Sequence, residues 1–261
     1  MIPYQSIQNR PYTKRGFTLV ELLVVMGVIA LLIGILLPML AGSIDRARAF
    51  KCQMSQRTVA FDFQLYADDQ LHSDRGDENH SRTFTIETFQ ESQYGVDEFW
   101  RWGDDASAHQ TPDDSGNDPM RCPSVKGPIT LRNNAACSSG AVSPPQNISY
   151  GFNARLNRAE ITDQHGRPRA VLARLSPAIL QESSVPLLLD VDGSRAFELG
   201  VMPIYTAPSL DSTGPYAYNR VWFPSTRHNG QANVAFIDGH VDSSSAPASE
   251  PDWRWEYQPI N

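Results

Sequence analysis

Residues 15–21 read Arg-Gly-Phe-Thr-Leu-Val-Glu, and a mostly apolar run follows from Leu22 to Gly42. As a helix that rises about 1.5 Å per residue, this run matches the hydrocarbon core of a membrane, which is about 30 Å thick. A basic leader that ends at Gly16 precedes the run, and Glu21 places one acidic side chain near its start. The segment therefore predicts a long N-terminal helix whose first half spans a membrane.

The junction differs from a secretory signal peptide in the place where it would be cut. A signal peptide has a shorter apolar region with a small-residue cleavage site behind it. Here the candidate cut, after Gly16, lies in front of the apolar run, so the run would stay with the mature protein. An acid such as Glu21 at the edge of a span is costly and usually functional, and we therefore expect it to have a specific partner.

Residues 15–21 resemble the type III signal of type IV pilins and type II secretion pseudopilins. The resemblance implies that a prepilin peptidase cuts after Gly16, that the new N-terminus on Phe17 is methylated, and that Glu21 becomes the fifth residue. It also implies a pilin-like α+β fold. In that fold a long helix, with a membrane half and an amphipathic half, packs on a small antiparallel β-sheet domain.

The physical chemistry of the segment agrees with a subunit that polymerises through its helix. Cleavage would leave a cation on the Phe17 amine, and Glu21 of a neighbouring subunit would supply the counter-charge. Ala30 and Gly34 form a small-xxx-small face, which lets helices approach closely. Pro38 leaves the Gly34 carbonyl without its helical donor, so the sequence predicts a helix kink there.

The sequence predicts three parts: a cleaved leader at 1–16, a helix at 17–69 with a transmembrane part at 22–42, and a globular domain at 70–261. Beyond the membrane the helix should remain amphipathic, because apolar residues recur at helical spacing. We expect this apolar stripe to pack on the globular domain. Its members are Ile44, Ala47, Met54, Phe61 and Leu65.

The charge balance bears on partners and location. The chain has 22 basic and 29 acidic residues, a net charge of −7, and loss of Arg10, Lys14 and Arg15 leaves 19 against 29, or −10. Such an acidic chain is a poor non-specific nucleic-acid binder, so we expect no nucleic-acid partner. The basic leader favours a single-pass inner-membrane protein with a periplasmic globular domain. The expected partners are prepilin peptidase, other pilin-like subunits and a secretion or pilus assembly platform.

Three cysteines suit an oxidising compartment, although they cannot all pair within one chain. A Cys52–Cys122 disulfide would join the helix to the globular domain, and this is the pairing we favour. A Cys122–Cys137 disulfide would instead close a short local loop. The sequence shows no clustered Cys/His spacing of the kind that predicts a zinc site.

Short elements follow the helix. Residues 83–89 alternate as a strand would, and 186–190 form a short apolar strand. Ser176 and Pro177 predict the start of a short helix that ends near Glu182. Residues 195–227 contain several prolines and tyrosines and look like an insertion.

Residues 228–243 form the second informative motif. Asp238-Gly239 is a strong signal for a short hairpin between strands at 232–237 and 240–243. The motif resembles the His-x9-Asp-Gly domain that follows pseudopilin-like N-termini in many large bacterial families, with His228 as its first residue. Four other segments also resemble that family: Cys52, Tyr66–Asp69, Arg121–Ser124 and Leu187–Gly193.

Two interpretations of the motif remain open. In the first, Asp190, Asp192 and Asp238 would supply oxygen ligands to a calcium ion; apart from this calcium, the sequence predicts no cofactor. In the other interpretation Asp238 shapes the turn, and His228 bonds locally to hold the loop against it.

The chain lacks the sequence motifs of common catalytic sites. It has no Gly-x-Ser-x-Gly, phosphate loop, dinucleotide glycine pattern or paired-His zinc motif, so we do not expect an enzyme. The favoured function is a structural subunit of a type II secretion pseudopilus or a type IV pilus-like filament. The alternative is a membrane-tethered periplasmic domain that recognises a surface or a polysaccharide through the 195–227 segment. The aromatic residues of that segment are Tyr205, Tyr216, Tyr218 and Trp222.

Overall fold

The structure is a computed structural model of the chain. It describes residues 16–72, 83–94, 120–125, 148–162, 164–201 and 204–259. The chain forms two compact units, Met1–Ile44 and Asp45–Asn261. Helix α1, Leu19–His72, contributes to both units and ends three residues later than the sequence predicts. The architecture is α+β, as expected, with one long N-terminal helix and a small sheet domain.

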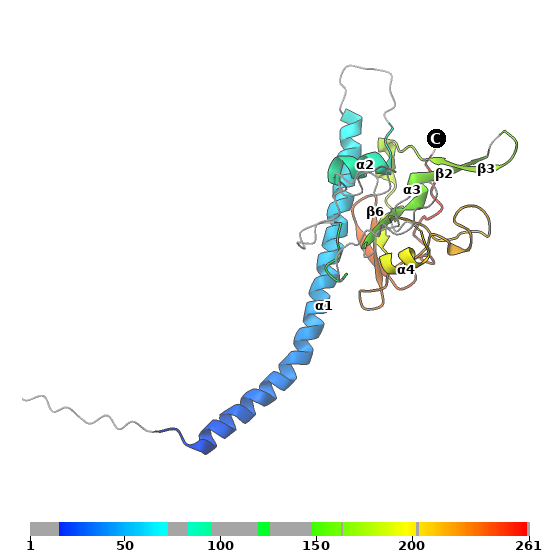
Figure 1. The fold of residues 1–261 in the computed structure, drawn as a ribbon. Coiled ribbons are helices and arrows are strands. Elements are labelled where there is room, and N and C mark those ends of the chain that lie inside the picture. The colour runs from blue at the N-terminus through cyan, green and yellow to red at the C-terminus, as the bar shows by residue number, and fades with distance from the viewer. Residues whose placement is uncertain are drawn as a thin grey trace, which may run out of the picture. The chain divides into compact units, whose positions relative to one another are not determined.

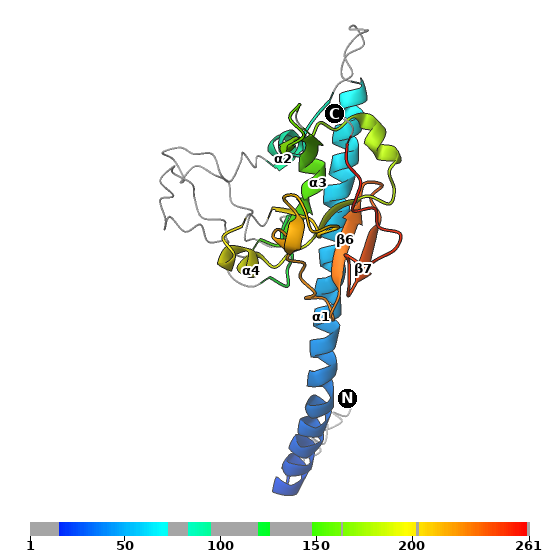
Figure 2. The ribbon, with the colours of Figure 1, turned by 90° about the vertical axis from the view of Figure 1, so that its right-hand side faces the viewer.

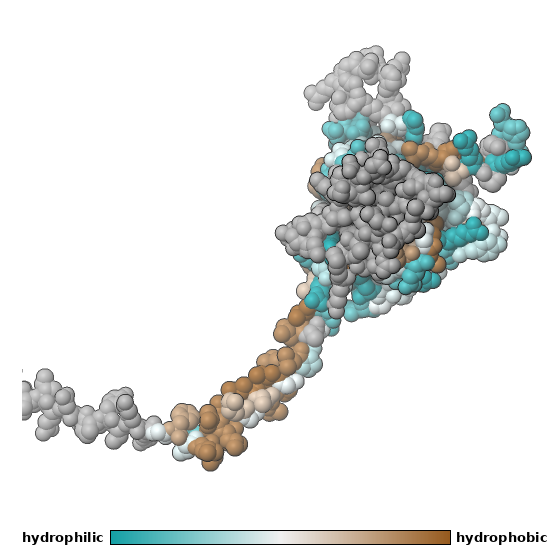
Figure 3. Space-filling view, viewed as in Figure 1, coloured by the Kyte–Doolittle hydropathy of each residue, from teal (hydrophilic) through white to brown (hydrophobic). Residues whose placement is uncertain are grey.

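The first part of α1 presents apolar side chains on all sides. Large apolar residues from Phe17 to Leu40 are exposed, and Figure 3 shows hydrophobic side chains covering this part of the helix. A helix that is apolar all round is typical of a membrane span. It is the one helix among the described residues that is long and apolar enough to cross a membrane. The helix continues through Pro38.

The globular unit is built on a five-stranded sheet with the strand order β5-β1-β4-β6-β7. Figures 1 and 2 show this unit in two views, with β6 beside α1. The strands are β1 (Tyr150–Asn153), β4 (Pro186–Asp190), β5 (Tyr205–Thr206), β6 (Ala232–Phe236) and β7 (Val241–Ser244). Every pairing is antiparallel except that of β1 with β5, which is parallel. The sheet is therefore mixed and not purely antiparallel, because β5 joins the edge after the long crossover that a parallel pair requires.

Smaller elements surround this sheet. Strands β2 (Arg158–Thr162) and β3 (Pro168–Leu172) form a separate antiparallel pair. The α-helices are α2 (Ile86–Tyr94), α3 (Ala154–Asn157) and α4 (Gly193–Glu198). Two 3-10 turns, η1 (Pro177–Gln181) and η2 (Ala217–Asn219), complete the described elements.

The second part of α1 runs alongside β6 and α2 in the globular unit (Figure 2). Phe63 is fully buried there and meets Phe89 of α2 edge to face, with ring centroids 5.3 Å apart. Polar side chains of the same helix bond to the sheet, with Gln53 Nε2 donating to Ser243 Oγ at 3.0 Å and Gln64 Nε2 to the Ile237 carbonyl at 3.0 Å. The helix is thus fixed to the sheet by both apolar packing and hydrogen bonds.

The face of α1 that packs on the domain is not the predicted one. All five members of the expected stripe are exposed, namely Ile44, Ala47, Met54, Phe61 and Leu65. The buried face consists of Cys52, Gln56, Val59, Ala60, Phe63 and Ala67. The prediction was wrong because hydropathy places Gln56 in solvent, whereas the structure buries it. The Gln56 amide donates a hydrogen bond to Asp190 Oδ1 at 3.1 Å, and this bond satisfies the polar side chain inside the core.

The predicted strand at 83–89 is also wrong. Only Phe84 pairs, in a single bridge to Leu175, and α2 begins at Ile86. Thr85 and Thr88 explain the helix start, because the Thr88 N–H donates to Thr85 Oγ1 at 3.1 Å and the Thr85 N–H donates to Thr88 Oγ1 at 3.0 Å. This reciprocal capping turns an alternating, threonine-rich segment into a helix N-terminus.

The C-terminal hairpin is confirmed, with a different turn. Only Gly239 in the loop has a positive φ, +87°, and its N–H donates to the Phe236 carbonyl at 3.0 Å. The Phe236 N–H in turn donates to the His240 carbonyl at 3.0 Å. This is a three-residue loop with glycine in the left-handed region after a type I turn, and not a two-residue Asp-Gly turn. The strand at 186–190 and the short helix after Ser176 are confirmed as β4 and η1.

The 195–227 segment belongs to the body of the domain. It supplies β5 at the sheet edge, and the Tyr216 hydroxyl donates to the carbonyls of Ala154 and Arg158 at 3.1 and 3.0 Å. Of the aromatic residues that the sequence points to, Tyr218 is the one that stays exposed.

Candidate functional site

Four side chains with metal-ligand chemistry meet in the core of the globular unit. They are Cys52, Cys122, Asp190 and His228, all buried, and one ligand atom from each lies within 4.8 Å of the others. Cys122 Sγ lies 3.4 Å from His228 Nε2. Asp190 Oδ1 lies 3.4 Å from Cys52 Sγ, and Asp190 Oδ2 lies 3.5 Å from His228 Nε2. It is the one such group within the described part of the chain.

Each member comes from a different element. Cys52 lies on α1, and Asp190 is the last residue of the buried strand β4. Cys122 lies in a turn closed by the Val125 N–H, which donates to the Cys122 carbonyl at 3.0 Å. His228 lies just before β6, where the His228 and Gln231 backbones bond to each other across a tight turn. Folding alone brings these residues together.

Polar groups around the cluster fix the Asp190 carboxylate. The Asn233 N–H donates to its Oδ2 at 2.9 Å, and Gln56 Nε2 donates to its Oδ1 at 3.1 Å. Arg227 Nη2 lies 3.5 Å from Oδ1 and donates to the Ser149 and Val191 carbonyls at 2.7 and 2.9 Å. These contacts hold the carboxylate, which is fully buried, in a single orientation.

The sulfur atoms have partners of their own. The Tyr150 hydroxyl lies 3.1 Å from Cys52 Sγ, and His228 Nε2 lies 3.4 Å from Cys122 Sγ. Hydrogen bonds to sulfur stabilise the thiolate relative to the thiol. The surroundings of Cys122 therefore favour its charged form.

The pKa values of the cluster move in different directions. Burial raises the pKa of the Cys52 thiol well above its usual range. The hydrogen bond with Cys52, with support from His228 and Arg227, lowers the pKa of Cys122. Burial raises the pKa of Asp190 to about 6, although the Arg227 charge opposes this. Cys122 thus carries negative charge more readily than Cys52.

The structure brings together part of the site that the sequence suggests. Cys52 and Cys122 are neighbours, as the favoured disulfide requires, and both are free thiols in the structure. The disulfide between them stays a prediction, and Cys137, the alternative partner, lies outside the described residues.

His228 and Asp238 do not work on the same turn. The His228 ring lies beside Cys122 and Asp190. Asp238 instead accepts a hydrogen bond from the His240 N–H at 3.1 Å and contacts the His240 ring. The expectation that His228 holds the hairpin loop against Asp238 is therefore wrong, because the chain folds His228 inward toward β4.

The three acids considered for calcium have separate contacts. Asp190 belongs to the buried cluster, and the Asp192 carboxylate caps α4 by accepting from the Arg195 N–H at 3.0 Å. Asp238 bonds within the hairpin. A calcium site formed by all three stays a prediction, and these contacts give each acid another use.

Sequence reasoning missed the four-residue cluster because its members lie far apart in the chain. Zinc motifs are recognised by short Cys and His spacings, which are absent here. A signal was nonetheless present. Each of the four residues belongs to, or is itself, one of the segments for which we predict the His-x9-Asp-Gly resemblance: Cys52, Arg121–Ser124, Leu187–Gly193 and the motif at 228–243.

The N-terminus of α1 has a site of its own. Glu21 Oε2 accepts hydrogen bonds from the Thr18 N–H and the Thr18 hydroxyl at 2.8 Å each, and the Glu21 N–H donates to Thr18 Oγ1 at 3.2 Å. This is a capping box, in which each side chain satisfies a donor that the helix leaves open. Gly16 and Phe17 precede it as exposed, non-helical residues. The candidate cleavage point is thus accessible.

Comparison with known proteins identifies this segment. Residues 12–37 match the family model of the prokaryotic N-terminal methylation motif. No curated protein and no solved structure matches the chain. The methylation motif supports a pilin-like N-terminus that anchors the protein in a membrane. The resemblance of residues 228–243 to the His-x9-Asp-Gly domain stays a prediction.

The methylation motif includes the residues that suit helix association. A Cβ added at Gly34 would meet nothing within 4 Å, so the glycine leaves an open place on the surface of the helix. Together with Ala30 one turn earlier, it lets another helix approach closely. The kink predicted at Gly34 and Pro38 stays a prediction.

Proposed function

We propose that the protein is a structural subunit of a pilin-like filament and polymerises through its N-terminal helix. The filament would be a type II secretion pseudopilus or a type IV pilus-like fibre. A prepilin peptidase would remove residues 1–16 and expose the Phe17 amine for methylation. The subunit would await assembly in the inner membrane, with its globular unit in the periplasm, and would join other pilin-like subunits on an assembly platform.

The observation that carries this proposal is the methylation motif with Glu21 in its capping box. Glu21 is the only acidic side chain in the apolar part of α1, and within the described part of the chain its hydrogen bonds go to Thr18. After cleavage the Phe17 amine would be positively charged and would be a strong hydrogen-bond donor to a carboxylate. A bundle of parallel helices would place this amine beside Glu21 of a neighbour and so set the axial register.

The exposed stripe on α1 supports the same conclusion. Sequence reasoning assigned Met54, Phe61 and Leu65 to packing within the chain, yet they are exposed, and so is Phe50. They follow each other at four- and seven-residue intervals, which places them along one side of the helix. A row of exposed apolar side chains along one side of a helix suits contact with another helix. Helices of neighbouring subunits would cover it.

The test is the variant Glu21→Val. It removes the carboxylate and leaves the span more apolar, so the protein should insert and be cleaved normally. It should be absent from the filaments that shearing releases from the cells, because each added subunit would bring an unpaired Phe17 cation into the bundle. The matched control is Asp45→Asn, which removes an exposed acid outside the span. Filaments formed equally well by Glu21→Val and wild type would refute polymerisation by this route.

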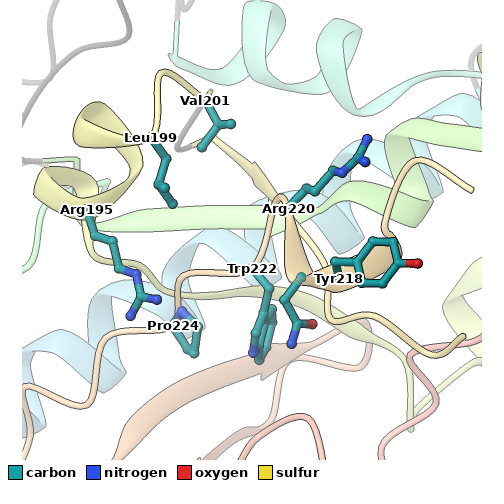
Figure 4. A pocket seen from close by; sticks show the side chains of 8 residues that line it. Arg195, Leu199, Val201, Tyr218, Arg220, Trp222 and Pro224 are labelled. Carbon is teal, nitrogen blue, oxygen red and sulfur yellow. The ribbon is translucent and has the colours of Figure 1, made fainter. Parts of the chain in front are cut away.

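A second candidate function rests on an open cleft of about 730 Å³ in the 195–227 segment (Figure 4). Arg195, Arg220 and Trp222 line it, together with Tyr218, which is 75% exposed. Cations beside an exposed aromatic ring suit an acidic polysaccharide. Wild-type protein should then be retained on immobilised alginate, and Tyr218→Ala should be released at lower salt. Equal elution of the two proteins would argue against this function.

A further inference from the structure

We propose that Cys52, Cys122, Asp190 and His228 bind one zinc ion. These residues supply two sulfurs, one carboxylate oxygen and one imidazole nitrogen, all buried in the domain core. A structural zinc site is four-coordinate and closed to solvent, and it takes ligands of these three kinds. The proposal does not depend on polymerisation, because it concerns the globular unit alone.

The distances fit a tetrahedral ion. Zinc lies about 2.3 Å from sulfur and about 2.1 Å from nitrogen or oxygen, so the edges of the ligand tetrahedron are about 3.4 to 3.8 Å long. Cys122 Sγ lies 3.4 Å from His228 Nε2, which matches one such edge. The Asp190 carboxylate reaches the other two ligands with different oxygens: Oδ1 lies 3.4 Å from Cys52 Sγ, and Oδ2 lies 3.5 Å from His228 Nε2. A rotation of the carboxylate would therefore bring one of its oxygens to the ion. The remaining pairs lie within 4.8 Å. A zinc ion at the centre requires only small adjustments of side chains.

The ligand types select zinc over the ions that carboxylates alone would bind. Calcium requires six to eight oxygen ligands and magnesium an octahedral oxygen shell, which a site with two sulfurs does not offer. Thiolate and imidazole ligands in a tetrahedral arrangement suit zinc, and cobalt(II) adopts the same geometry as a spectroscopic substitute. The set also differs from the three-aspartate calcium site considered from the sequence.

Neighbouring polar groups hold the four side chains in position by hydrogen bonds. The Asn233 N–H and the Gln56 amide donate to the Asp190 carboxylate. The Tyr150 hydroxyl lies beside Cys52 Sγ at 3.1 Å. Such contacts orient ligands before the metal arrives and are a normal part of a metal site.

Charge balance is also met. Two thiolates, one carboxylate and a neutral imidazole around a divalent ion leave a net charge of −1. Arg227, with Nη2 3.5 Å from Asp190 Oδ1, supplies the opposite charge.

The ion would join parts of the domain that are distant in sequence. It would tie α1, through Cys52, to the 120–125 turn, to the end of β4 and to the turn before β6. The helix would then be fixed to the globular unit by coordination bonds as well as by packing. Because such a site does not exist in the unfolded chain, zinc binding would stabilise the fold directly.

A Cys52–Cys122 disulfide is the competing use of the same two sulfurs. It would remove two of the four ligands and release both thiol hydrogens to an oxidant. The two states are mutually exclusive in one molecule, and they differ in mass, metal content and thiol reactivity. One preparation therefore distinguishes them.

The experiment uses the mature full-length protein, purified in detergent from cells grown with zinc. Elemental analysis should find one zinc per chain, and intact mass analysis should find both thiols reduced. Replacement of zinc by cobalt(II) should give the intense visible bands of a tetrahedral thiolate site. His228→Ala should lose the metal, whereas His240→Ala, which changes an exposed histidine outside the cluster, should retain it.

Two results would overturn the proposal. One is a metal-free protein whose mass is lower by two hydrogens, with a Cys52–Cys122 cross-linked peptide. The other is a wild-type protein with free thiols that takes up neither zinc nor cobalt. If His228→Ala fails to fold, the cobalt spectrum of the wild type and the conservative variant Asp190→Asn, which should shift that spectrum, still decide the matter.

Discussion

Glu21 Oε2 lies 2.8 Å from both the backbone nitrogen and the hydroxyl oxygen of Thr18, so the carboxylate caps its own helix before any neighbour is present. This contact gives Glu21 two roles that are open to separate tests. The cap requires an oxygen acceptor, which either an acid or an amide provides. Pairing with the Phe17 amine of a neighbour requires the negative charge.

The variant Glu21→Gln separates these roles. The amide oxygen still accepts from Thr18, so the helix should begin at the same residue and insertion should be unchanged. Assembly should be lost as fully as in Glu21→Val, because the charge is missing. Thr18→Ala should show the reverse pattern: a weakened cap worth about 1 kcal/mol and assembly that persists. Filament yield after shearing measures both, and robust assembly of Glu21→Gln would disprove the charge-pairing role.

Two phenylalanines on α1 test which face of the helix packs on the domain. Phe63 is 0% exposed, whereas Phe61, a member of the predicted stripe, is 54% exposed. Phe63→Ala should lower the free energy of unfolding by about 3–5 kcal/mol through lost contacts and a cavity. Phe61→Ala should lower it by less than about 1 kcal/mol. Urea unfolding followed by tryptophan fluorescence checks this, and equal effects would contradict the observed orientation of the helix.

The hairpin loop predicts unequal effects at Asp238 and Gly239. Gly239 has φ +87°, and a Cβ there would lie 3.5 Å from the Gln64 side chain. Gly239→Ala should therefore destabilise the domain by about 1–2 kcal/mol through backbone strain. Asp238→Asn should be nearly neutral, because the amide oxygen can still accept from the His240 N–H. Thermal melting compares the two, and a larger loss for Asp238→Asn would show that its charge matters.

Calcium should not change the stability of the protein. The Asp192 and Asp238 side chains already bond within α4 and within the hairpin, and Asp190 is buried beside two cysteines. A ligand that binds only the native state raises its stability by an amount that grows with concentration. We therefore expect the melting temperature to stay constant as calcium chloride is added. A melting temperature that rises with calcium concentration in the wild type, but not in Asp238→Asn, would instead support a calcium site at Asp238.

The parts of the fold that local signals specify were predictable. The apolar run and its basic leader predict the N-terminal helix, and the family match at residues 12–37 agrees with that interpretation. Pro177 after Ser176, the apolar strand at 186–190 and the Asp238-Gly239 turn each fix an element through short-range chemistry. Such signals need no knowledge of distant residues.

The parts that depend on distant partners were not predictable. Gln56 is polar, yet it is buried because Asp190 accepts its amide hydrogen. This contact selects the packed face of α1 and leaves Phe61 outside. The cluster around Cys52 was missed for the same reason, since its members lie far apart in the chain and meet only in the folded domain. Tertiary contacts override local hydropathy at these positions.

The central claim is that residues 12–37 are a prepilin signal that is processed before assembly. Its most direct test is mass analysis of the N-terminal peptide of the protein isolated from native membranes. We predict a mature chain that begins at Phe17 with a methylated amine. Gly16→Ala should cause only a modest processing defect, and Gly16→Leu should block cleavage. A wild-type protein that keeps residues 1–16, or one that is cut after Gly42, would contradict the claim.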